Sequence, residues 1–475
     1  MRIEPARRLR GKLFLPGDKS ISHRAAIIAA MASEGRARIS NFSTSADCAS
    51  TLAALRGLGI SIRREADAVL VEGDAGRASS ASLKLTRRLR APLHPLDCGN
   101  SGSTMRMLAG LLAGQPFASV LMGDESLCAR PMKRIIEPLE LMGARLYSDE
   151  GRAPLRVEGR APLDAIRYEM PVASAQVKSA ILLAGLNARG RTEVVEGETR
   201  TRDHTERMLR WLGVQVETTK ETRHRWNEDG VEERDENGAQ ERKDTGEVRS
   251  VASCVVSVEG MKSFEARDID VPGDISSAAF LIAAAALLDG SDLTLEGVGL
   301  NPTRTEILRT MRALGAEVEA SNVREVCGEE VGDVRIVGAG GSLSGGEASV
   351  LGGALVARLI DELPVLAVVG SQVEGGLRIR DASELRVKES DRIRATVENL
   401  RAMGAEVEEY PDGLSVGGRT RLRGARLRAH GDHRIAMAFT VAALIADGAS
   451  ELEGAESVAV SFPEFFRLLE SVTER

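Results

Sequence analysis

The chain has 475 residues, 43% of them hydrophobic, and carries a formal net charge of −7 at pH 7. This length can form two or three domains, and the nearly balanced charge argues against nucleic-acid or anionic-membrane partners. No apolar run approaches the roughly 20 residues that span a membrane, and no signal-type apolar stretch follows the basic N-terminus, so we expect a cytoplasmic protein.

Cysteine, histidine and lysine usage narrows the chemistry. Five scattered cysteines predict reduced thiols rather than disulfides or a zinc site. The six histidines include no pair with ligand spacing, so no metal is expected. The basic residues are 54 arginines and only 9 lysines. A buried lysine can lose its proton at neutral pH and arginine cannot, which draws attention to three lysines inside motifs: Lys19, Lys178 and Lys388.

Six alanine-rich helical stretches recur along the chain, each opened by polar residues. The predicted helices begin near residues 19–20, 100–102, 174–176, 274–276, 361–362 and 432–434. They are expected to end near a glycine that forms a left-handed cap, at Gly35, Gly114, Gly190, Gly290, Gly375 and Gly448.

A second repeat confirms the number of units. It consists of a helix end, a glycine and an alternating strand, at 55–62, 139–146, 209–216, 311–318 and 400–407, with a truncated sixth copy at 465–472. Three plus three units predict two α/β domains, residues 17–264 and residues 1–16 with 265–475. The N-terminal strand at 8–15 is expected to lie in the second domain and complete its truncated unit.

This division makes the chain cross between domains twice, near 16–17 and 264–272, and a double crossing suits hinge closure over a ligand. An insertion at 218–250, in which 17 of 33 residues are charged, separates two predicted strands of the third unit. We expect a solvated long hairpin or a disordered loop there and assign it no function.

The polar helix starts are candidate anion sites, because a helix N-terminus presents free N–H groups and a positive dipole end. In residues 16–24, Lys19 adjoins Ser20 and Arg24, which are four apart and share a helical face. A serine N-cap with an exposed arginine is an equally good interpretation of this segment alone. The spacing is not that of a nucleotide P-loop.

The second unit offers two further signals. Gly102, at the next helix start, lets a ligand approach the backbone. Arg130 precedes a proline, which keeps its backbone extended and could present its guanidinium to phosphate or carboxylate. Each signal is weak alone, because glycine-rich turns and surface Arg-Pro pairs are common.

The third unit supplies Ser174 and Gln176 at one helix start and Arg202 before the next. There His204 and Glu206 are interpreted as capping or supporting groups.

The second half adds carboxylates. Asp361 precedes a helix, where a plain N-cap is a strong alternative. Lys388 and Arg392, four apart, are expected to share a face with Glu389 beside them, and Arg434 opens the sixth helix.

Seven cations are thus expected at corresponding ends of the six units: Lys19, Arg24, Arg130, Arg202, Lys388, Arg392 and Arg434. They would repel one another unless anions join them. A phosphate carries about −1.5 to −2 charges, so two ligands that each carry a phosphate and a carboxylate would balance the set. Lys19, Lys388, Asp361 and Glu389 are acid–base candidates, so the sequence indicates two small, highly anionic substrates and proton transfer.

Several strings closely resemble motifs of the 5-enolpyruvylshikimate-3-phosphate synthase family. They are PGDKSISHR at 16–24, GNSGSTMR at 99–106, LRVKESDR at 385–392 and GDHRIAM at 431–437. SAQVK at 174–178, RDHTE at 202–206 and NPTR at 301–304 resemble the second, largely bacterial class of that family. The resemblance covers nearly the whole chain apart from the insertion.

The resemblance implies a two-domain inverse α/β barrel built from six βαβαββ units, three per domain. The domains would close over shikimate 3-phosphate and phosphoenolpyruvate. Shikimate 3-phosphate would be held by Lys19, Ser20, Arg24, Ser174, Gln176, Arg202, Asp361 and Lys388. Phosphoenolpyruvate would be held by Lys19, Gly102, Arg130, Gln176, Arg392 and Arg434.

The implied reaction is an addition followed by an elimination, in the shikimate pathway to chorismate and aromatic amino acids. Asp361 would be the base for the 5-hydroxyl, and Glu389 or Lys19 would protonate the methylene. No metal or organic cofactor is implied, and we expect a monomer with glyphosate as a candidate inhibitor. Val460 departs from the lysine that many members carry two residues before Phe-Pro, so one phosphate contact is in doubt.

Two other hypotheses remain. The related transferase for UDP-N-acetylglucosamine would show Lys-Asn at 19–20 and a cysteine five residues before its Arg-Pro, whereas Cys128 lies only two before Arg130. A non-catalytic anion-binding relative would lack the proton-transfer residues that are present here.

Overall fold

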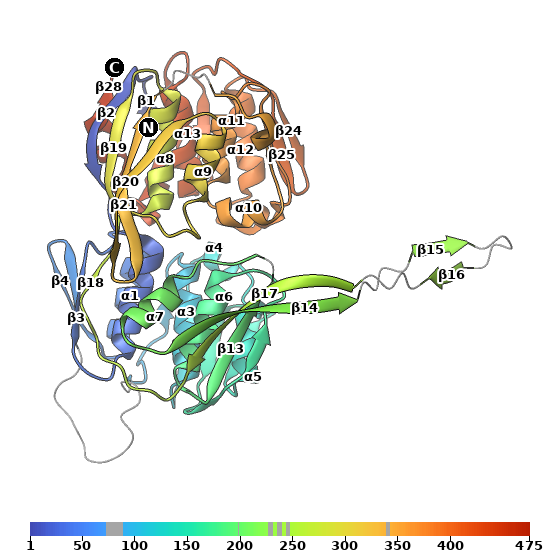
Figure 1. Ribbon diagram of the computed structural model, residues 1–475. Coiled ribbons are helices and arrows are strands. Elements are labelled where there is room, and N and C mark those ends of the chain that lie inside the picture. Colours follow the sequence, from blue (N-terminus) through green and yellow to red (C-terminus); the bar gives the residue numbers. More distant parts are fainter. Residues whose placement is uncertain (73–88, 198, 227–230, 235–239, 244–247, 339–342) are drawn as a thin grey trace.

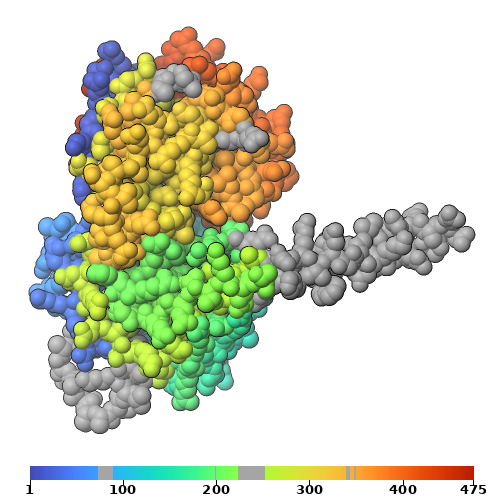
Figure 2. Space-filling model, viewed as in Figure 1, coloured from blue at the N-terminus to red at the C-terminus, as the bar shows by residue number. Residues whose placement is uncertain are grey.

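The computed structural model describes residues 1–475 except 73–88, 198, 227–230, 235–239, 244–247 and 339–342, and describes only the backbone of the rest of 223–251 and of 347–348. Two lobes lie one above the other (Figure 1) and meet along a waist (Figure 2). One hydrophobic core draws on residues 21–271, and the other on residues 3–15 with 275–472.

The lower lobe contains elements between residues 19 and 270. Its helices are α1 (Lys19–Met31), α2 (Ala46–Gly57), α3 (Gly102–Ala113), α4 (Glu125–Cys128), α5 (Lys133–Leu141), α6 (Ala175–Gly185) and α7 (His204–Trp211). Its strands are β3 (Arg36–Ser40), β4 (Ser61–Glu65), β5 (Ala68–Glu72), β6 (Leu96–Asp97), β7 (Ala118–Met122), β8 (Arg145–Asp149), β9 (Arg152–Glu158), β10 (Leu163–Asp164), β11 (Arg167–Glu169), β12 (Ala188–Arg189), β13 (Arg191–Glu196), β14 (Val216–Trp226), β15 (Val231–Arg234), β16 (Gln240–Lys243), β17 (Val248–Glu259) and β18 (Ile269–Asp270).

The upper lobe contains the rest. Its helices are α8 (Ile275–Leu287), α9 (Glu306–Ala313), α10 (Ala354–Leu359), α11 (Leu363–Gly370), α12 (Arg392–Ala402), α13 (His433–Leu444) and α14 (Phe465–Val472), with 3-10 turns η1 (Gly346–Ser349), η2 (Ser383–Val387) and η3 (Ala455–Val460). Its strands are β1 (Arg2–Ile3), β2 (Arg8–Phe14), β19 (Asp292–Gly299), β20 (Glu317–Val326), β21 (Glu329–Val337), β22 (Val350–Leu351), β23 (Leu377–Ile379), β24 (Val407–Tyr410), β25 (Gly413–Val416), β26 (Arg426–Arg428), β27 (Ser450–Glu453) and β28 (Thr473–Glu474).

The six predicted repeats share one sheet pattern. A parallel pair is extended by antiparallel strands in β18-β3-β5-β4, in β6-β7-β9-β8, in β11-β13-β17-β14 and in β22-β23-β25-β24. The same order appears in β2-β19-β21-β20, and β26-β27-β1 is its shortened form. The predicted α/β architecture of repeated units is therefore confirmed.

The two crossings exchange strands between lobes. β2 precedes α1 in the chain but runs parallel to β19, whereas β18 precedes α8 but runs parallel to β3. The N-terminal strand therefore belongs to the fourth unit, and the prediction that it completes the sixth was wrong. β1 pairs with β27 in that role, whereas β2 pairs with two residues of β28 and packs against α14 of the sixth unit.

The predicted helix ends need correction. Five of the six proposed glycines have positive φ, but each lies two to four residues beyond the C-cap of its helix, and Gly114 is itself the C-cap with φ −87°. The left-handed cap belongs instead to the second repeat, as at Gly59, where φ is +86° and the amide of the next residue, Ile60, donates to Leu55 O at 3.1 Å.

Where the structure describes it, the insertion is paired as a hairpin, which is one of the two predicted alternatives; residues 227–230, 235–239 and 244–247 lie outside the described residues. β14 and β17 remain paired from Val216 with Val258 to Trp226 with Val248, and β15 pairs with β16 further out. This arm projects away from the lower lobe (Figure 1). Within the described ranges, no helix combines the length and the apolar character needed to span a membrane.

Candidate active site

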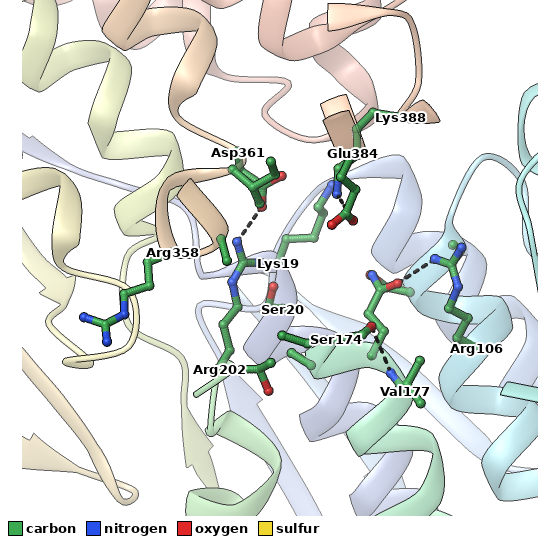
Figure 3. Close-up of a pocket in the computed structure, with 18 of the residues that line it drawn as sticks. Lys19, Ser20, Arg106, Ser174, Val177, Arg202, Arg358, Asp361, Glu384 and Lys388 are labelled. Atoms are coloured by element: carbon green, nitrogen blue, oxygen red, sulfur yellow. Dashed lines mark hydrogen bonds and ion pairs between the residues drawn. The ribbon is translucent and has the colours of Figure 1, made fainter. Parts of the chain in front are cut away.

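A cavity of about 260 Å³ lies between the lobes, and every residue assigned from sequence to catalysis or substrate binding lines it. These residues are Lys19, Ser20, Arg24, Gly102, Arg130, Ser174, Gln176, Arg202, Asp361, Lys388, Glu389, Arg392 and Arg434. Figure 3 shows Lys19, Ser20, Ser174, Arg202, Asp361 and Lys388 among them. The sequence prediction that they come together is confirmed in position. Their individual roles stay predictions.

All six alanine-rich helices direct their N-termini to this cavity. Its lining includes the starts of α1, α3, α6 and α13, the N-cap of α8 and the residue two before α11. Side-chain caps fix five of these starts, all but that of α11, as where Asp18 accepts from Ile21 N and Ser174 from Val177 N. Free N–H groups and positive dipole ends therefore converge on one space from both lobes.

Two ion pairs cross the cavity between the lobes. Arg202 Nη2 donates to Asp361 Oδ2 at 2.5 Å, and Arg130 Nη1 lies 3.5 Å from Glu389 Oε1. Arg130 is also held on its own side, because its Nη2 donates to Asn100 Oδ1 at 2.6 Å. Candidate ligand-binding cations of the lower lobe thus contact candidate acid–base carboxylates of the upper lobe.

Lys19 and Arg434 also have carboxylate partners. Lys19 Nζ donates to Asp47 Oδ2 at 2.8 Å. Burial would lower the pKa of Lys19, but the charge and hydrogen bond of Asp47 outweigh it and raise that pKa. Arg434 Nη1 donates to Ser276 Oγ at 2.6 Å and lies 3.5 Å from Glu362 Oε1.

Arg392 is the most enclosed of these cations. Its Nε donates to Asp432 Oδ2 at 2.8 Å and its Nη2 to Glu389 Oε2 at 2.6 Å, while its Nη1 lies 3.5 Å from Asp361 Oδ1. Three carboxylates therefore surround one buried guanidinium.

The surrounding cations set the ionisation of both candidate catalytic carboxylates. Burial would raise the pKa of Asp361, but Arg202, Arg434, Lys388 and Arg392 together hold it well below its usual range. Burial is likewise overcome at Glu389, whose pKa is lowered chiefly by Arg392. In the ligand-free cavity both side chains are ionised at neutral pH, whereas Lys19 is protonated.

Arg24 confirms the predicted shared face with Ser20. Its Nη1 donates to Ser20 O at 2.8 Å, one helical turn away. Its Nε and Nη2 donate at 2.8 Å to Thr205 Oγ1 and Ser179 Oγ, so α6 and α7 fix the guanidinium from behind. The alternative of an exposed arginine is wrong, because Arg24 is buried.

Two other predictions require correction. Lys388 and Arg392 do not share a helical face, because Asp391 caps α12 and Lys388 lies before it, with Nζ donating to Glu384 Oε1 at 2.9 Å. Lys178 is buried away from the cavity, where its Nζ lies 3.1 Å from Glu196 Oε2 and 2.7 Å from Glu206 Oε1.

Sequence reasoning missed several carboxylates that pair with the cations of the cavity. Asp432 and Glu362 were interpreted as parts of helix starts, and Asp47 stood in no motif. Arg106 was also missed, although it ends the GNSGSTMR string. Its Nη1 donates to Gln176 Oε1 at 2.5 Å, and a Cβ added at Gly102 would lie 2.7 Å from the same nitrogen.

The described residues include no group of three or more His, Cys, Asp or Glu side chains arranged for a metal ion. The basic side chains and helix N-termini of the cavity suit anionic ligands of small size.

Comparisons with known proteins agree with this description. The sequence model of a family described as EPSP synthase (3-phosphoshikimate 1-carboxyvinyltransferase) matches residues 3–241 and 245–469. The 3-phosphoshikimate 1-carboxyvinyltransferase of Koribacter versatilis is 49% identical over 476 residues, covering 100% of this chain and 99% of that protein, and that of Solibacter usitatus is 45% identical with 100% and 99% coverage. The solved structure of EPSP synthase from Acinetobacter baumannii aligns with a TM-score of 0.79 at 36% identity, covering 99% of this chain and 98% of that one.

Proposed function

We propose that this chain, which belongs to the EPSP synthase family, transfers the enolpyruvyl group of phosphoenolpyruvate to the 5-hydroxyl of shikimate 3-phosphate and releases phosphate. The observation that carries the proposal is the convergence of six helix starts and twelve lysine and arginine residues, the seven predicted ones among them, on one cavity. Such a site can neutralise two substrates that each carry a phosphate and a carboxylate.

We assign the two substrates to neighbouring sets of residues that share Lys19 and Gln176. Shikimate 3-phosphate is assigned to Lys19, Ser20, Arg24, Ser174, Gln176, Arg202, Asp361 and Lys388. Phosphoenolpyruvate is assigned to Lys19, Gly102, Arg130, Gln176, Arg392 and Arg434. The fixed guanidinium of Arg24 and the helix starts around it support a phosphate at this end of the cavity.

The ionisation states support distinct roles in proton transfer. Asp361 is ionised and can accept the proton of the 5-hydroxyl as its oxygen attacks C2 of phosphoenolpyruvate. Lys19 is protonated and can donate to the methylene carbon, which becomes a methyl group. Glu389 is ionised and can accept a methyl proton when the bond from C2 to the phosphate oxygen breaks. Phosphate leaves with the electron pair of that bond.

Substrate binding would exchange partners within this site. Phosphate and carboxylate oxygens take the places that Asp361 and Glu389 occupy on Arg202, Arg130 and Arg392. Freed of these cations, the two carboxylates gain basicity. Binding therefore brings the pKa of the proposed bases closer to the range in which they work.

The alternatives have weaker support. Cys128 does not line the cavity among the described residues, and its Sγ lies 3.4 Å from Gly123 O, which supports a passive thiol over the loop cysteine of the UDP-N-acetylglucosamine transferase. The presence of Lys19, Asp361 and Glu389 at one cavity argues against a non-catalytic relative.

We further propose that the two cores correspond to domains of residues 17–264 and of residues 1–16 with 265–475. β18 lies in the second of these segments, although it pairs with β3 of the first. The chain is proposed to act as a cytoplasmic monomer, with glyphosate as a candidate inhibitor at the phosphoenolpyruvate positions.

Steady-state release of phosphate tests the activity. The protein should release phosphate only when shikimate 3-phosphate and phosphoenolpyruvate are both present. Absence of release, or equal release with UDP-N-acetylglucosamine as acceptor, would contradict the proposal.

A further inference from the structure

Three consecutive residues of the lower lobe contact the upper lobe. Arg202 pairs with Asp361, Asp203 Oδ1 accepts from Asn301 Nδ2 at 2.7 Å, and His204 Nδ1 lies 2.7 Å from Glu329 Oε1. Only Arg202 of this triplet lines the cavity. The other two contacts lie directly behind its wall.

The contacts behind the wall form one buried cluster. Asn301 Nδ2 also donates to Glu329 Oε2 at 2.9 Å. Asn301 therefore contacts both Asp203 and Glu329, the partner of His204, and so links the two contacts. His204, Asn301 and Glu329 are all buried. On the other face, Arg207 Nε donates to Asp203 Oδ1 at 2.9 Å. We call Asp203, His204, Asn301 and Glu329 the clasp.

The clasp joins the lobes where the β20–β21 hairpin of the upper lobe reaches α7 of the lower (Figure 1). Gly328, at the tip, accepts from Arg207 Nη1 at 3.2 Å, and Cys327 packs against the lower core. A Cβ at Gly328 would lie 3.1 Å from Arg207 O, so the tip sits closely on the helix.

Arg202 has no regular secondary structure of its own to hold it. It lies between β13 and α7, in a segment that follows the end of the strand. Its neighbour Thr201 is anchored to the lower lobe, where its amide donates to Glu196 Oε1 at 2.9 Å. Its other neighbour, Asp203, is anchored to the upper lobe through Asn301. The backbone of Arg202 is therefore fixed from both sides by side-chain hydrogen bonds.

We propose that Asp203, His204, Asn301 and Glu329 are positioning residues that hold Arg202 in the geometry that binds shikimate 3-phosphate. The inference rests on the proposed function. When the substrate replaces Asp361 on Arg202, that side-chain contact between the lobes is lost. The clasp remains, because none of its members lines the cavity. The clasp keeps the guanidinium of Arg202 in place when Asp361 leaves it. Substrate binding then loses less conformational entropy in ordering Arg202.

The test uses Asn301→Ala with Asn399→Ala as its matched control. Asn399 is also buried and bonded at both ends of its amide, with Nδ2 donating to Arg428 O and Oδ1 accepting from Arg428 N at 2.9 Å each, but it lies within the upper lobe. Calorimetric titration with shikimate 3-phosphate should show about tenfold weaker binding for Asn301→Ala, within the range of coupled neighbours. Asn399→Ala should bind as the wild type does.

A second arm asks whether the clasp acts through Arg202. The variant Arg202→Ala/Asn301→Ala should bind shikimate 3-phosphate no more weakly than Arg202→Ala alone, because the positioned group is already gone. If Asn301→Ala does not fold, the same measurements are made on Glu329→Gln. This change keeps the side chain's size but removes one of the two oxygens that contact His204 and Asn301. Thermal unfolding of each variant accompanies the titrations.

Three results would overturn the proposal. The first is an unchanged affinity for shikimate 3-phosphate in a folded clasp variant, and the second is an equal loss of affinity in Asn301→Ala and Asn399→Ala. The third is a double variant whose fold-loss of affinity equals the product of the losses in Arg202→Ala and Asn301→Ala. These differ from failure of the proposed function, which would appear in the wild type as no phosphate release and no binding of shikimate 3-phosphate.

Discussion

Replacing Glu389 with glutamine separates chemistry from binding at this site. The glutamine keeps the size of the side chain but removes the negative charge between Arg130 and Arg392 and the group proposed to accept the methyl proton. Loss of a general base typically costs about 10²- to 10⁴-fold in rate. We expect kcat to fall by at least about 100-fold.

The same change should preserve or improve the binding of phosphoenolpyruvate. Glu389 competes with this substrate for two guanidinium groups, and its hydrogen bond to Arg392 Nη2 measures 2.6 Å. Hydrogen bonds to charged groups contribute about 1.5–3 kcal/mol net, but the side chain is 20% exposed and water screens part of this. Relief of about 1 kcal/mol, or roughly fivefold in Kd, is the expected gain.

The assay combines steady-state phosphate release with calorimetric titration of phosphoenolpyruvate against the complex with shikimate 3-phosphate. Turnover within threefold of the wild type would refute the assignment, and Lys19 with Asp361 would then have to carry every proton transfer. Lys19→Arg is a poorer test, because the bulkier guanidinium also changes the packing around Asp47.

Three further outcomes are expected. Arg24→Ala and Arg202→Ala should each weaken the binding of shikimate 3-phosphate by about 2–4 kcal/mol, the cost of losing a buried charged contact, and should affect the binding of phosphoenolpyruvate much less. Calorimetry that gave both variants the wild-type affinity for shikimate 3-phosphate would contradict this assignment. Small-angle scattering should show a smaller radius of gyration when shikimate 3-phosphate saturates the protein, because both lobes contribute residues assigned to substrate binding; an unchanged radius would exclude closure. Burial lowers the pKa of His23 to about 3, so the unfolded chain binds its proton first, and His23 should contribute a loss of about 1.4 kcal/mol of stability per unit as pH drops between about 6 and 4. His433, whose pKa burial also lowers to about 3, should add to the same decline. Denaturant unfolding of His23→Gln should show a shallower decline, and an identical slope would disprove this origin.

Local patterns were sufficient to predict the repeats and the helix starts that line the cavity. Alanine-rich periodicity and N-capping side chains such as Asp18 and Ser174 are encoded within a few residues, so the helix starts could be found without tertiary information. Their convergence followed from the repetition, because equivalent ends of equivalent units lie together.

What escaped the sequence depends on contacts between distant segments. The exchange of β2 and β18 joins strands about 280 and 230 residues apart, for which a strand's own composition carries no signal. Asp432 has two functions at once, as the cap of α13 and as the partner of Arg392. The predicted shared face of Lys388 and Arg392 failed because a four-residue spacing aligns side chains only within one continuous helix, and Lys388 lies before α12.

The ion pairs between cations and carboxylates at the cavity make its charges interdependent. Removing Arg392 alone would leave Asp432 buried without its main counter-ion, and an uncompensated buried charge of this kind costs about 3–5 kcal/mol. Redesigning this cavity for a less charged acceptor would therefore mean replacing cation and carboxylate together, pair by pair. Tolerance of single substitutions should thus be lowest where the internal partner is most deeply enclosed, at Arg392, and higher at Lys388, whose partner Glu384 is open to solvent.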